Sequence, residues 1–358
     1  MSGTSLGAAS AANRPANWAE RIGIGHVLLA FFLLVYPAFA SDFFLTQIGG
    51  YSMTLGLIAL SLMLLAGYGG MVSLAQITVA GVAGYAVAIL GVNNSGVHGF
   101  GWPWWLHVPV AIFLASIVSA LIGWISVRTA GIYTIMITLA IATACFYFAQ
   151  QNYTLFNGFP GYNGLKPPEL FGVYWRNPVP FYYLCLANAV VAYAAVLYGR
   201  RSTFGLSLQA IRDNPRRMRA IGFDVTAHKV FAWWIAGIIA GAGGVLLVWF
   251  NGRISPGTIG VGPAINILVI AIIGGLRHPI GPFLGALVVV LMQTFAIDIV
   301  GAERFNTLIG LVFLAIVFVS PDGILGLWER FGPQGDRDGR GLRKAESPAK
   351  SFNKGRIK

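Results

Sequence analysis

Charged residues are scarce in this sequence, and acidic ones are the scarcest. Only 10% of the 358 residues are Asp, Glu, Lys or Arg, with 12 acidic side chains against 24 basic ones. An ordinary soluble domain carries about 25% charged residues. Because 56% of the residues are hydrophobic, the composition excludes a soluble domain and favours an integral membrane protein.

Long apolar runs dominate the chain, and several reach the roughly 20 residues that a helix needs to cross a bilayer. Runs such as 265–273 do not alternate between apolar and polar residues, as the strands of a membrane barrel would. We therefore predict an all-α polytopic membrane protein with about ten transmembrane helices. The predicted spans are 24–41, 48–66, 71–92, 105–127, 130–150, 179–199, 227–250, 261–276, 280–299 and 305–321.

The basic residues predict the orientation, because cytoplasmic loops of membrane proteins are enriched in Lys and Arg. With ten spans and the N-terminus inside, four of the 24 basic residues fall outside, namely Lys166, Arg176, Arg253 and Arg304. We therefore predict a multi-pass membrane protein with both termini cytoplasmic.

We predict three segments: a cytoplasmic N-terminal segment (1–23), a transmembrane domain (24–326) and a basic cytoplasmic tail (327–358). The composition of the tail predicts disorder. The apolar run after Arg21 ends in Ala38-Phe39-Ala40, which is also typical of a cleaved secretory leader. Cleavage of residues 1–40 and retention of a first span both remain open, and both leave the orientation after Ser41 unchanged.

Glycine is abundant, with 46 residues, and small residues recur four positions apart inside the spans. Examples are Ala80/Gly84, Gly237/Gly241 and Gly281/Gly285. Such spacing lets helix backbones approach closely in lipid, so we interpret it as packing. The Gly-rich breaks at 67–70 and 274–275 indicate two weakly similar halves, roughly 48–150 and 227–321.

The predicted spans contain almost no ionisable residues, and Asp298 is the acidic residue closest to a span interior. Gradient-driven transporters usually place such groups inside their spans. The sequence also lacks a phosphate-binding loop, a metal-ligand spacing and a catalytic motif, and Cys145 and Cys185 lie in apolar runs. We predict a non-catalytic protein without cofactor or metal, in which a partner supplies the energy for any pumping.

The cytoplasmic loop at 200–226 is the candidate docking site for such a partner. Asp213 or Asn214 suits the N-cap of a short helix, Pro215 its first turn and Gly222 its end. A basic helix lying on lipid headgroups is the alternative interpretation. On the other side, the turn-rich loop 151–178 is either a contact for an external delivery protein or an ordinary connection.

Four stretches of the sequence form a recognisable set. They are Gly67–Gln76 with Gly84-Tyr85, the run from Ala210 to Gly222, Ser255-Pro256 followed by Gly274-Gly275-Leu276 and Gly281-Pro282-x-x-Gly285, and Ser320–Gly326. In the same order, these stretches resemble permeases of high-affinity branched-chain amino-acid ABC importers, and the run from Ala210 to Gly222 resembles their coupling loop. The resemblance implies a location in the bacterial inner membrane. Departures at Ala75, 215–217 and 277–279 leave the solute open among branched-chain amino acids, urea, amides and other small solutes.

The resemblance implies a heteromeric importer with a second homologous permease, cytoplasmic ATP-binding subunits and an external solute-binding protein. ATP would be used by the partner subunits, and their closure would push on the helix at 210–222. The coupling residues implied are Arg212, Asp213, Asn214, Pro215, Arg216, Arg217, Arg219 and Gly222.

Recognition of a zwitterion in a channel without fixed charges has to come from hydroxyls, amides and helix ends. The pathway candidates are Ser73, Gln76, Thr78, Asn266 and Gln293. Hydrogen bonds between helices are the alternative role for each of them. Two other functions stay open: a secondary transporter driven by an ion gradient, and a membrane scaffold or enzyme subunit.

Overall fold

The computed structural model describes residues 32–95, 99–129, 131–170 and 173–300, together with isolated positions between 307 and 326. The predicted segment 1–23, residues 24–31 of the first predicted span, most of the predicted span 305–321, and the tail 327–358 lie outside the described residues. The side chain of Asp298 lies outside them as well.

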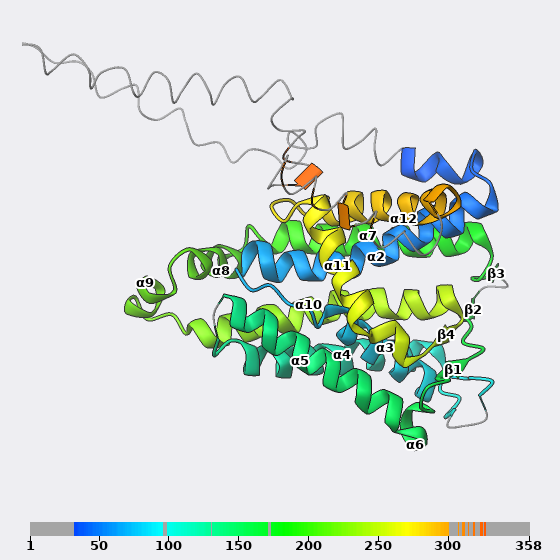
Figure 1. Ribbon diagram of the computed structural model, residues 1–358, viewed down its shortest axis with the longest axis horizontal. Helices are drawn as coiled ribbons and strands as arrows, with labels where there is room; N and C mark the ends of the chain where they lie inside the picture. Colours follow the sequence, from blue (N-terminus) through cyan, green and yellow to red (C-terminus); the bar gives the residue numbers. More distant parts are fainter. Residues whose placement is uncertain are drawn as a thin grey trace, which may run out of the picture.

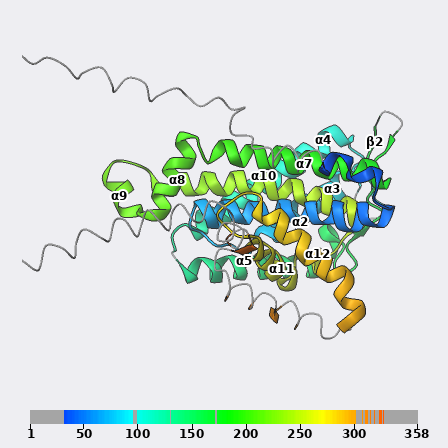
Figure 2. The same ribbon diagram turned by 90° about the horizontal axis from the view of Figure 1, so that it is seen from above.

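The described part is a bundle of helices, most of which run along its long axis (Figures 1 and 2). The central helix α2 is extended by π-helical turns, η3 before it and η4 after it, into one continuous helix from Phe44 to Tyr68. The main helices are η3 (Phe44–Gly50), α2 (Tyr51–Met63), η4 (Leu64–Tyr68), α3 (Gln76–Leu90), α4 (Trp104–Ser126), α5 (Ile132–Gln151), α7 (Pro178–Gly199), α10 (Val225–Asn251), α11 (Val261–Gly274) and α12 (Gly281–Val300).

Each predicted span between 48 and 299 corresponds to a helix. Among the described residues, five helices are long and apolar enough to cross a membrane: Phe44–Tyr68, α4, α5, α7 and α10. The helices α3, α11 and the stretch Gly281–Phe295 of α12 are shorter apolar helices. The third span, predicted at 71–92, starts late, because Gly70 has a φ of +66° and the chain is not helical again before Gln76.

The centre of the bundle is formed by the helix Phe44–Tyr68, of which 94% is buried, together with α3 and α10. Close backbone contacts confirm the predicted small-residue packing. A Cβ on Gly244 of α10 would overlap the carbonyl oxygen of Ala80 in α3, and one on Gly285 would overlap that of Ile270 in α11. Gly241 approaches α4 less closely, since a Cβ there would lie 3.2 Å from the Ala115 methyl group. Helices α4, α5 and α7 lie outside this centre and are one third buried or less.

The two ends of the bundle differ (Figure 1). We call the end that carries α8 (Thr203–Asp213) and α9 (Pro215–Ala220) the α9 end, and the opposite one the strand end. The short elements of the strand end are α6 (Tyr153–Phe156), β1 (Tyr162–Asn163), β2 (Glu169–Leu170), β3 (Val173–Tyr174), β4 (Arg253–Ile254) and η5 (Pro256–Ile259). The remaining short helix is η2 (Tyr36–Ala38).

The segment 151–178 folds onto the end of α10. Strand β1 pairs antiparallel with β4, with Tyr162 opposite Ile254, and β2 pairs with β3. The Tyr162 hydroxyl donates to the Leu155 carbonyl at 2.7 Å, and burial raises the pKa of this hydroxyl. Gly161, at a φ of +64°, packs against the Ile254 carbonyl where a side chain would clash. The turn-rich segment is thus closely packed, with two-residue strands within it.

Candidate coupling and pathway sites

The α9 end is built by two consecutive caps. The Ser202 hydroxyl accepts from the Gly205 amide at 3.2 Å and begins α8. The Asn214 side chain accepts from the Arg217 amide at 3.0 Å and begins α9, with Pro215 in the first turn. Gly222 follows α9 with a φ of +92°. The predicted short helix is therefore confirmed, although α8 before it was not predicted and makes most of the loop helical.

The α8–α9 segment is held in place by a small apolar cluster of Ile211, Met218 and Val225. Its exposed face is basic, because Arg216, Arg217 and Arg219 are all exposed. A buried side and a basic exposed side suit a rigid element that meets a partner or lipid headgroups.

The Arg212 side chain lies against the end of the bundle and is 41% exposed. Its guanidinium donates a hydrogen bond to the Gly67 carbonyl, and it forms an ion pair with Asp213 at 2.9 Å. Its aliphatic stem covers Gly70, where a Cβ would come within 2.6 Å of the Arg212 Cγ. The end of α8 is therefore attached to the break between η4 and α3. In the sequence, Arg212 and the break at 67–70 belong to separate motifs, and neither motif predicts the contact between them.

Three pathway candidates lie together after this break. Ser73, Gln76 and Thr78 are each 1% exposed. The Ser73 hydroxyl accepts from the Ala75 amide at 3.1 Å, and the Ser61 hydroxyl of α2 donates to Gln76 Oε1 at 2.9 Å. Within the described part of the chain, Gln76 Nε2 and the Thr78 hydroxyl have no hydrogen-bond partner. Buried polar groups usually find partners, so these two are exceptions in the interior of the bundle.

Helix α3 begins inside the bundle. Its 15 residues span about 22 Å, less than the roughly 30 Å of a bilayer core. No side chain caps its N-terminus at Ala75, so the first amides of the helix carry a partial positive charge. Ile259, just before the 14-residue α11, packs against Gly81 of α3, whereas Val261 at the start of α11 is 38% exposed. Interrupted helices of this kind form the central sites of many transporters.

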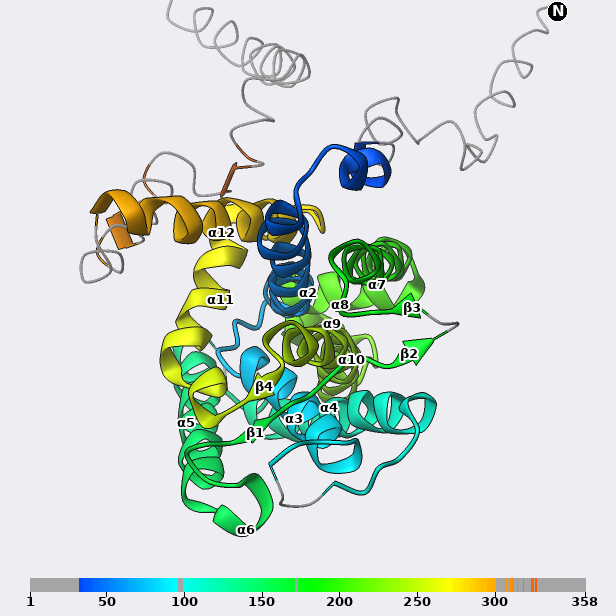
Figure 3. The same ribbon diagram turned by 90° about the vertical axis from the view of Figure 1, so that its right-hand side faces the viewer.

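The other two candidates are less closely placed. Asn266 is half-buried on α11, which packs against α3. Gln293 is half-buried on α12, and Figure 3 shows α2 and α11 between α12 and α3. The structure therefore does not bring Gln293 to the site around Gln76.

The described acidic side chains all lie outside the interior of the membrane-length helices. Asp42 precedes η3, Glu169 lies in β2, and Asp213 ends α8. The carboxylate of Asp224 caps α10 by accepting from the Ala227 amide at 3.0 Å. No group of three His, Cys, Asp or Glu residues that could hold a metal was found in the part of the chain that the structure describes.

Comparison with known proteins places the chain in a family. The family model "branched-chain amino acid transport system / permease component" matches residues 44–318. The high-affinity branched-chain amino acid transport system permease protein LivM of Escherichia coli is 23% identical over 292 residues, which cover 75% of this chain and 65% of that protein. The chain thus spans about 65% of the length of this relative.

Two further relatives show the breadth of the similarity. The probable branched-chain amino acid transport permease protein LivH of Methanocaldococcus jannaschii is 31% identical over 139 residues, 36% of this chain and 43% of that one. The nucleoside ABC transporter permease protein NupC of Lactococcus lactis is 22% identical over 241 residues, 64% of this chain and 74% of that one. No solved structure matches the chain. Because the family model covers most of the chain, the protein belongs to the family of branched-chain amino acid transport system permease components.

Proposed function

We propose that this chain is a transmembrane permease subunit of an ATP-binding cassette importer for branched-chain amino acids. The observation that carries the proposal is the match of residues 44–318 to the permease family. The absence of acidic side chains from the interior of the described spans supports it, since a zwitterion with an aliphatic side chain needs no fixed countercharge of one sign. The chain itself is proposed to be non-catalytic.

The proposed assembly contains cytoplasmic ATP-binding subunits, a second homologous permease and an external solute-binding protein. The α9 end is the proposed contact for the ATP-binding subunits, because α8 and α9 project beyond the other helices (Figures 1 and 2). The exposed Arg side chains of α9 bind that partner in this proposal. The hydrogen bond from Arg212 to the Gly67 carbonyl then transmits a displacement of α8 to the bundle.

The proposed pathway runs past the start of α3. The uncapped helix end and the Gln76 amide nitrogen offer donors to a carboxylate, and Asn266 on the neighbouring α11 is a further candidate. With this function, the α9 end faces the cytoplasm and the strand end faces outward. The full topology we propose has ten spans in the inner membrane, two similar halves and both termini inside.

An uptake experiment tests the proposal. The chain is reconstituted into vesicles with its partner subunits, and entry of labelled leucine is followed with ATP or with an ion gradient as the sole energy source. We expect uptake that needs ATP and continues after ionophores collapse the gradient. Uptake that follows the gradient and ignores ATP would instead establish the secondary transporter.

Nucleosides provide a second solute to examine, because the similarity to NupC covers 64% of this chain. In the same vesicles, excess unlabelled leucine, isoleucine and valine should each reduce uptake of labelled leucine, whereas excess adenosine or uridine should not. Inhibition by the nucleosides alone would reassign the solute while leaving the importer class intact.

A further inference from the structure

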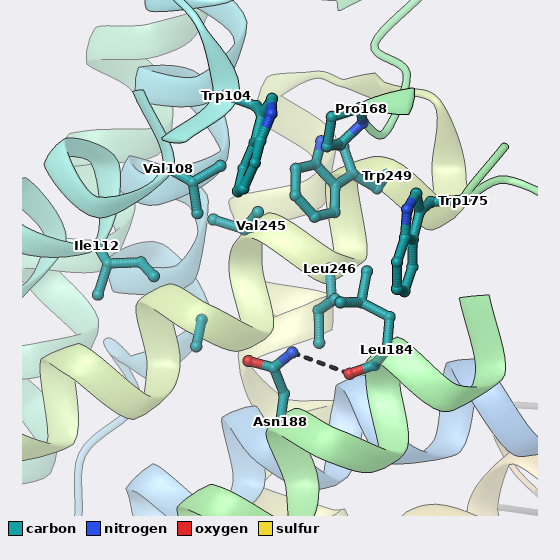
Figure 4. A pocket seen from close by; sticks show the side chains of 11 residues that line it. Trp104, Val108, Ile112, Pro168, Trp175, Leu184, Asn188, Val245, Leu246 and Trp249 are labelled. Carbon is teal, nitrogen blue, oxygen red and sulfur yellow. Dashed lines mark hydrogen bonds between the residues drawn. The ribbon is translucent and has the colours of Figure 1, made fainter. Parts of the chain in front are cut away.

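A cavity of about 180 Å³ lies between α4, α7 and α10 near the strand end, covered by Pro168 and Trp175 (Figure 4). Three indole rings, those of Trp104, Trp175 and Trp249, line it, and we call it the tryptophan cavity. The proposed transport pathway past Gln76 does not use it.

The lining of the tryptophan cavity is almost entirely apolar. Asn188 is the one amide side chain among its lining residues, and its Nδ2 donates to the Leu184 carbonyl of its own helix at 2.9 Å (Figure 4). Apolar cavities of about 150 Å³ remain dry and bind small hydrocarbons. The tryptophan cavity therefore suits a hydrocarbon group far better than water or a polar solute.

The surroundings of the cavity are those of a membrane surface. Trp104 starts α4 and Trp249 lies in the last turn of α10, so the cavity is at the level where tryptophan rings meet headgroups. Only 33% of the residues in the apolar stretch of α4, and likewise of α7, are buried in the bundle, so both helices have surface that faces lipid. Trp104 itself is 38% exposed, so the cavity is accessible from that side.

A second cavity of about 320 Å³ adjoins the first and shares Trp104, Pro168 and Trp249 with it. The exposed Lys166 lines this second cavity. Between residues 152 and 177 the charged side chains are Lys166, Arg176 and the single carboxylate Glu169. An apolar cavity therefore continues into one that offers a cation, in a segment whose charges are mainly positive.

We propose that the two cavities form a phospholipid site. The acyl chain enters the tryptophan cavity between α4 and α7, and the phosphate lies in the second cavity beside Lys166. The proposed orientation makes this an outer-leaflet lipid, and the site itself does not depend on the importer function. A bound acyl chain fills the space between α4 and α7 over α10.

The experiment uses the full chain in vesicles with trace amounts of two photoreactive lipids. Both carry the same diazirine-labelled acyl chain, one as phosphatidylglycerol and the other as diacylglycerol, which lacks the phosphate. The crosslinks are mapped by mass spectrometry on residues 104–112 and 242–249, with the lipid-exposed Val190 and Val191 of α7 as reference. We expect phosphatidylglycerol to label the cavity segments about fivefold more than diacylglycerol does, as one cation near a headgroup would produce.

Two variants separate the parts of the site. Ala242→Phe fills the tryptophan cavity from α10 and should reduce its labelling by both lipids about tenfold, whereas Ala187→Phe, at an exposed position of α7 outside the lining, should not. Lys166→Gln should abolish the preference for phosphatidylglycerol and leave diacylglycerol labelling unchanged. If Ala242→Phe does not fold, lipid labelling of the unmodified chain and of Lys166→Gln still tests the proposal.

Equal labelling of the cavity segments and the Val190 reference in the unmodified chain would overturn the proposal. A preference for phosphatidylglycerol that survives Lys166→Gln would overturn the headgroup assignment. Displacement of the label by saturating leucine would show a solute site in place of a lipid site.

Discussion

Arg212 in α8 donates a hydrogen bond to the carbonyl oxygen of Gly67, 145 residues earlier in the chain. The acceptor lies in η4, directly before the non-helical stretch that leads to Ser73 and Gln76. This contact joins the proposed coupling helices to the proposed pathway through a single side chain. In the proposed function, a displacement of α8 would reach the start of α3 through η4 and the non-helical stretch that follows it.

Arg212→Ala should uncouple the importer. The substitution removes the bond to Gly67 and leaves α9 in place, because the Ile211, Met218 and Val225 cluster is untouched. We expect normal membrane insertion, ATP hydrolysis that no longer responds to solute, and uptake reduced about tenfold or more, as loss of one charged hydrogen bond predicts. Arg212→Lys should recover part of the uptake, since a lysine has no fork to hold both Gly67 and Asp213. Unchanged uptake in Arg212→Ala would contradict the proposed link.

Gly222→Ala tests whether the turn after α9 must keep its shape. At a φ of +92° an alanine is strained by about 1–2 kcal/mol, although the space around the Cβ is open. Gly199→Ala is the matched control, since its Cβ also meets nothing within 4 Å and its backbone is unstrained. We expect reduced uptake and faster proteolysis of the α9 end in the first variant alone. The same uptake and the same rate of proteolysis in both variants would show that coupling does not need the positive φ at Gly222.

Gly244→Ala should destabilise the bundle, because the new methyl group would overlap the Ala80 carbonyl between α10 and α3. Overpacking of this kind costs about 1–3 kcal/mol. Gly262→Ala in α11 is the control, since nothing lies within 4 Å of its Cβ. Thermal unfolding in detergent should show a lower midpoint for Gly244→Ala and no decrease for Gly262→Ala. A shift of the same size in both would mean that the helices do not approach as closely as described.

Gln76→Ala should change the rate of transport more than the choice of solute. It removes the Nε2 group that has no partner in the described part of the chain, together with the bond from Ser61. Ser61→Ala removes that bond and the local bond from the Ser61 hydroxyl to the Ile58 carbonyl of its own helix, but it leaves the Gln76 amide in place. An effect that Gln76→Ala has and Ser61→Ala lacks therefore belongs to the amide nitrogen. We expect slower leucine uptake in Gln76→Ala, a smaller effect in Ser61→Ala and the same order of preference among solutes in both. A switch of solute in Gln76→Ala would place specificity in the permease itself.

Local sequence signals predicted the α9 end well. Asn214, Pro215 and Gly222 specify the start and end of α9 through capping, a fixed φ and a positive φ, and none of these depends on distant residues. The close packing of Gly241 and Gly285 could be predicted for the same reason, because small residues four apart permit close approach whatever their partner.

Features that depend on tertiary contacts were not predictable. The late start of α3 requires a broken backbone between Gly70 and Gln76, whereas the apolar pattern continues through it from Met71. The Arg212 bond to Gly67 joins segments far apart in sequence, so spacing gives no sign of it. The count of ten spans and the two similar halves stay predictions, since residues 24–31 of the first span and most of the tenth span lie outside the described residues.

The number of solute molecules imported per ATP hydrolysed, measured in Arg217→Glu, tests the account most directly. Arg217 is exposed on α9, and Arg201→Glu, exposed at the same end before α8, is the matched control. We predict that Arg217→Glu inserts normally and hydrolyses ATP but imports little leucine, so its ratio falls while that of Arg201→Glu stays near the unmodified value. A normal ratio in Arg217→Glu would contradict the claim that α9 couples ATP hydrolysis to transport.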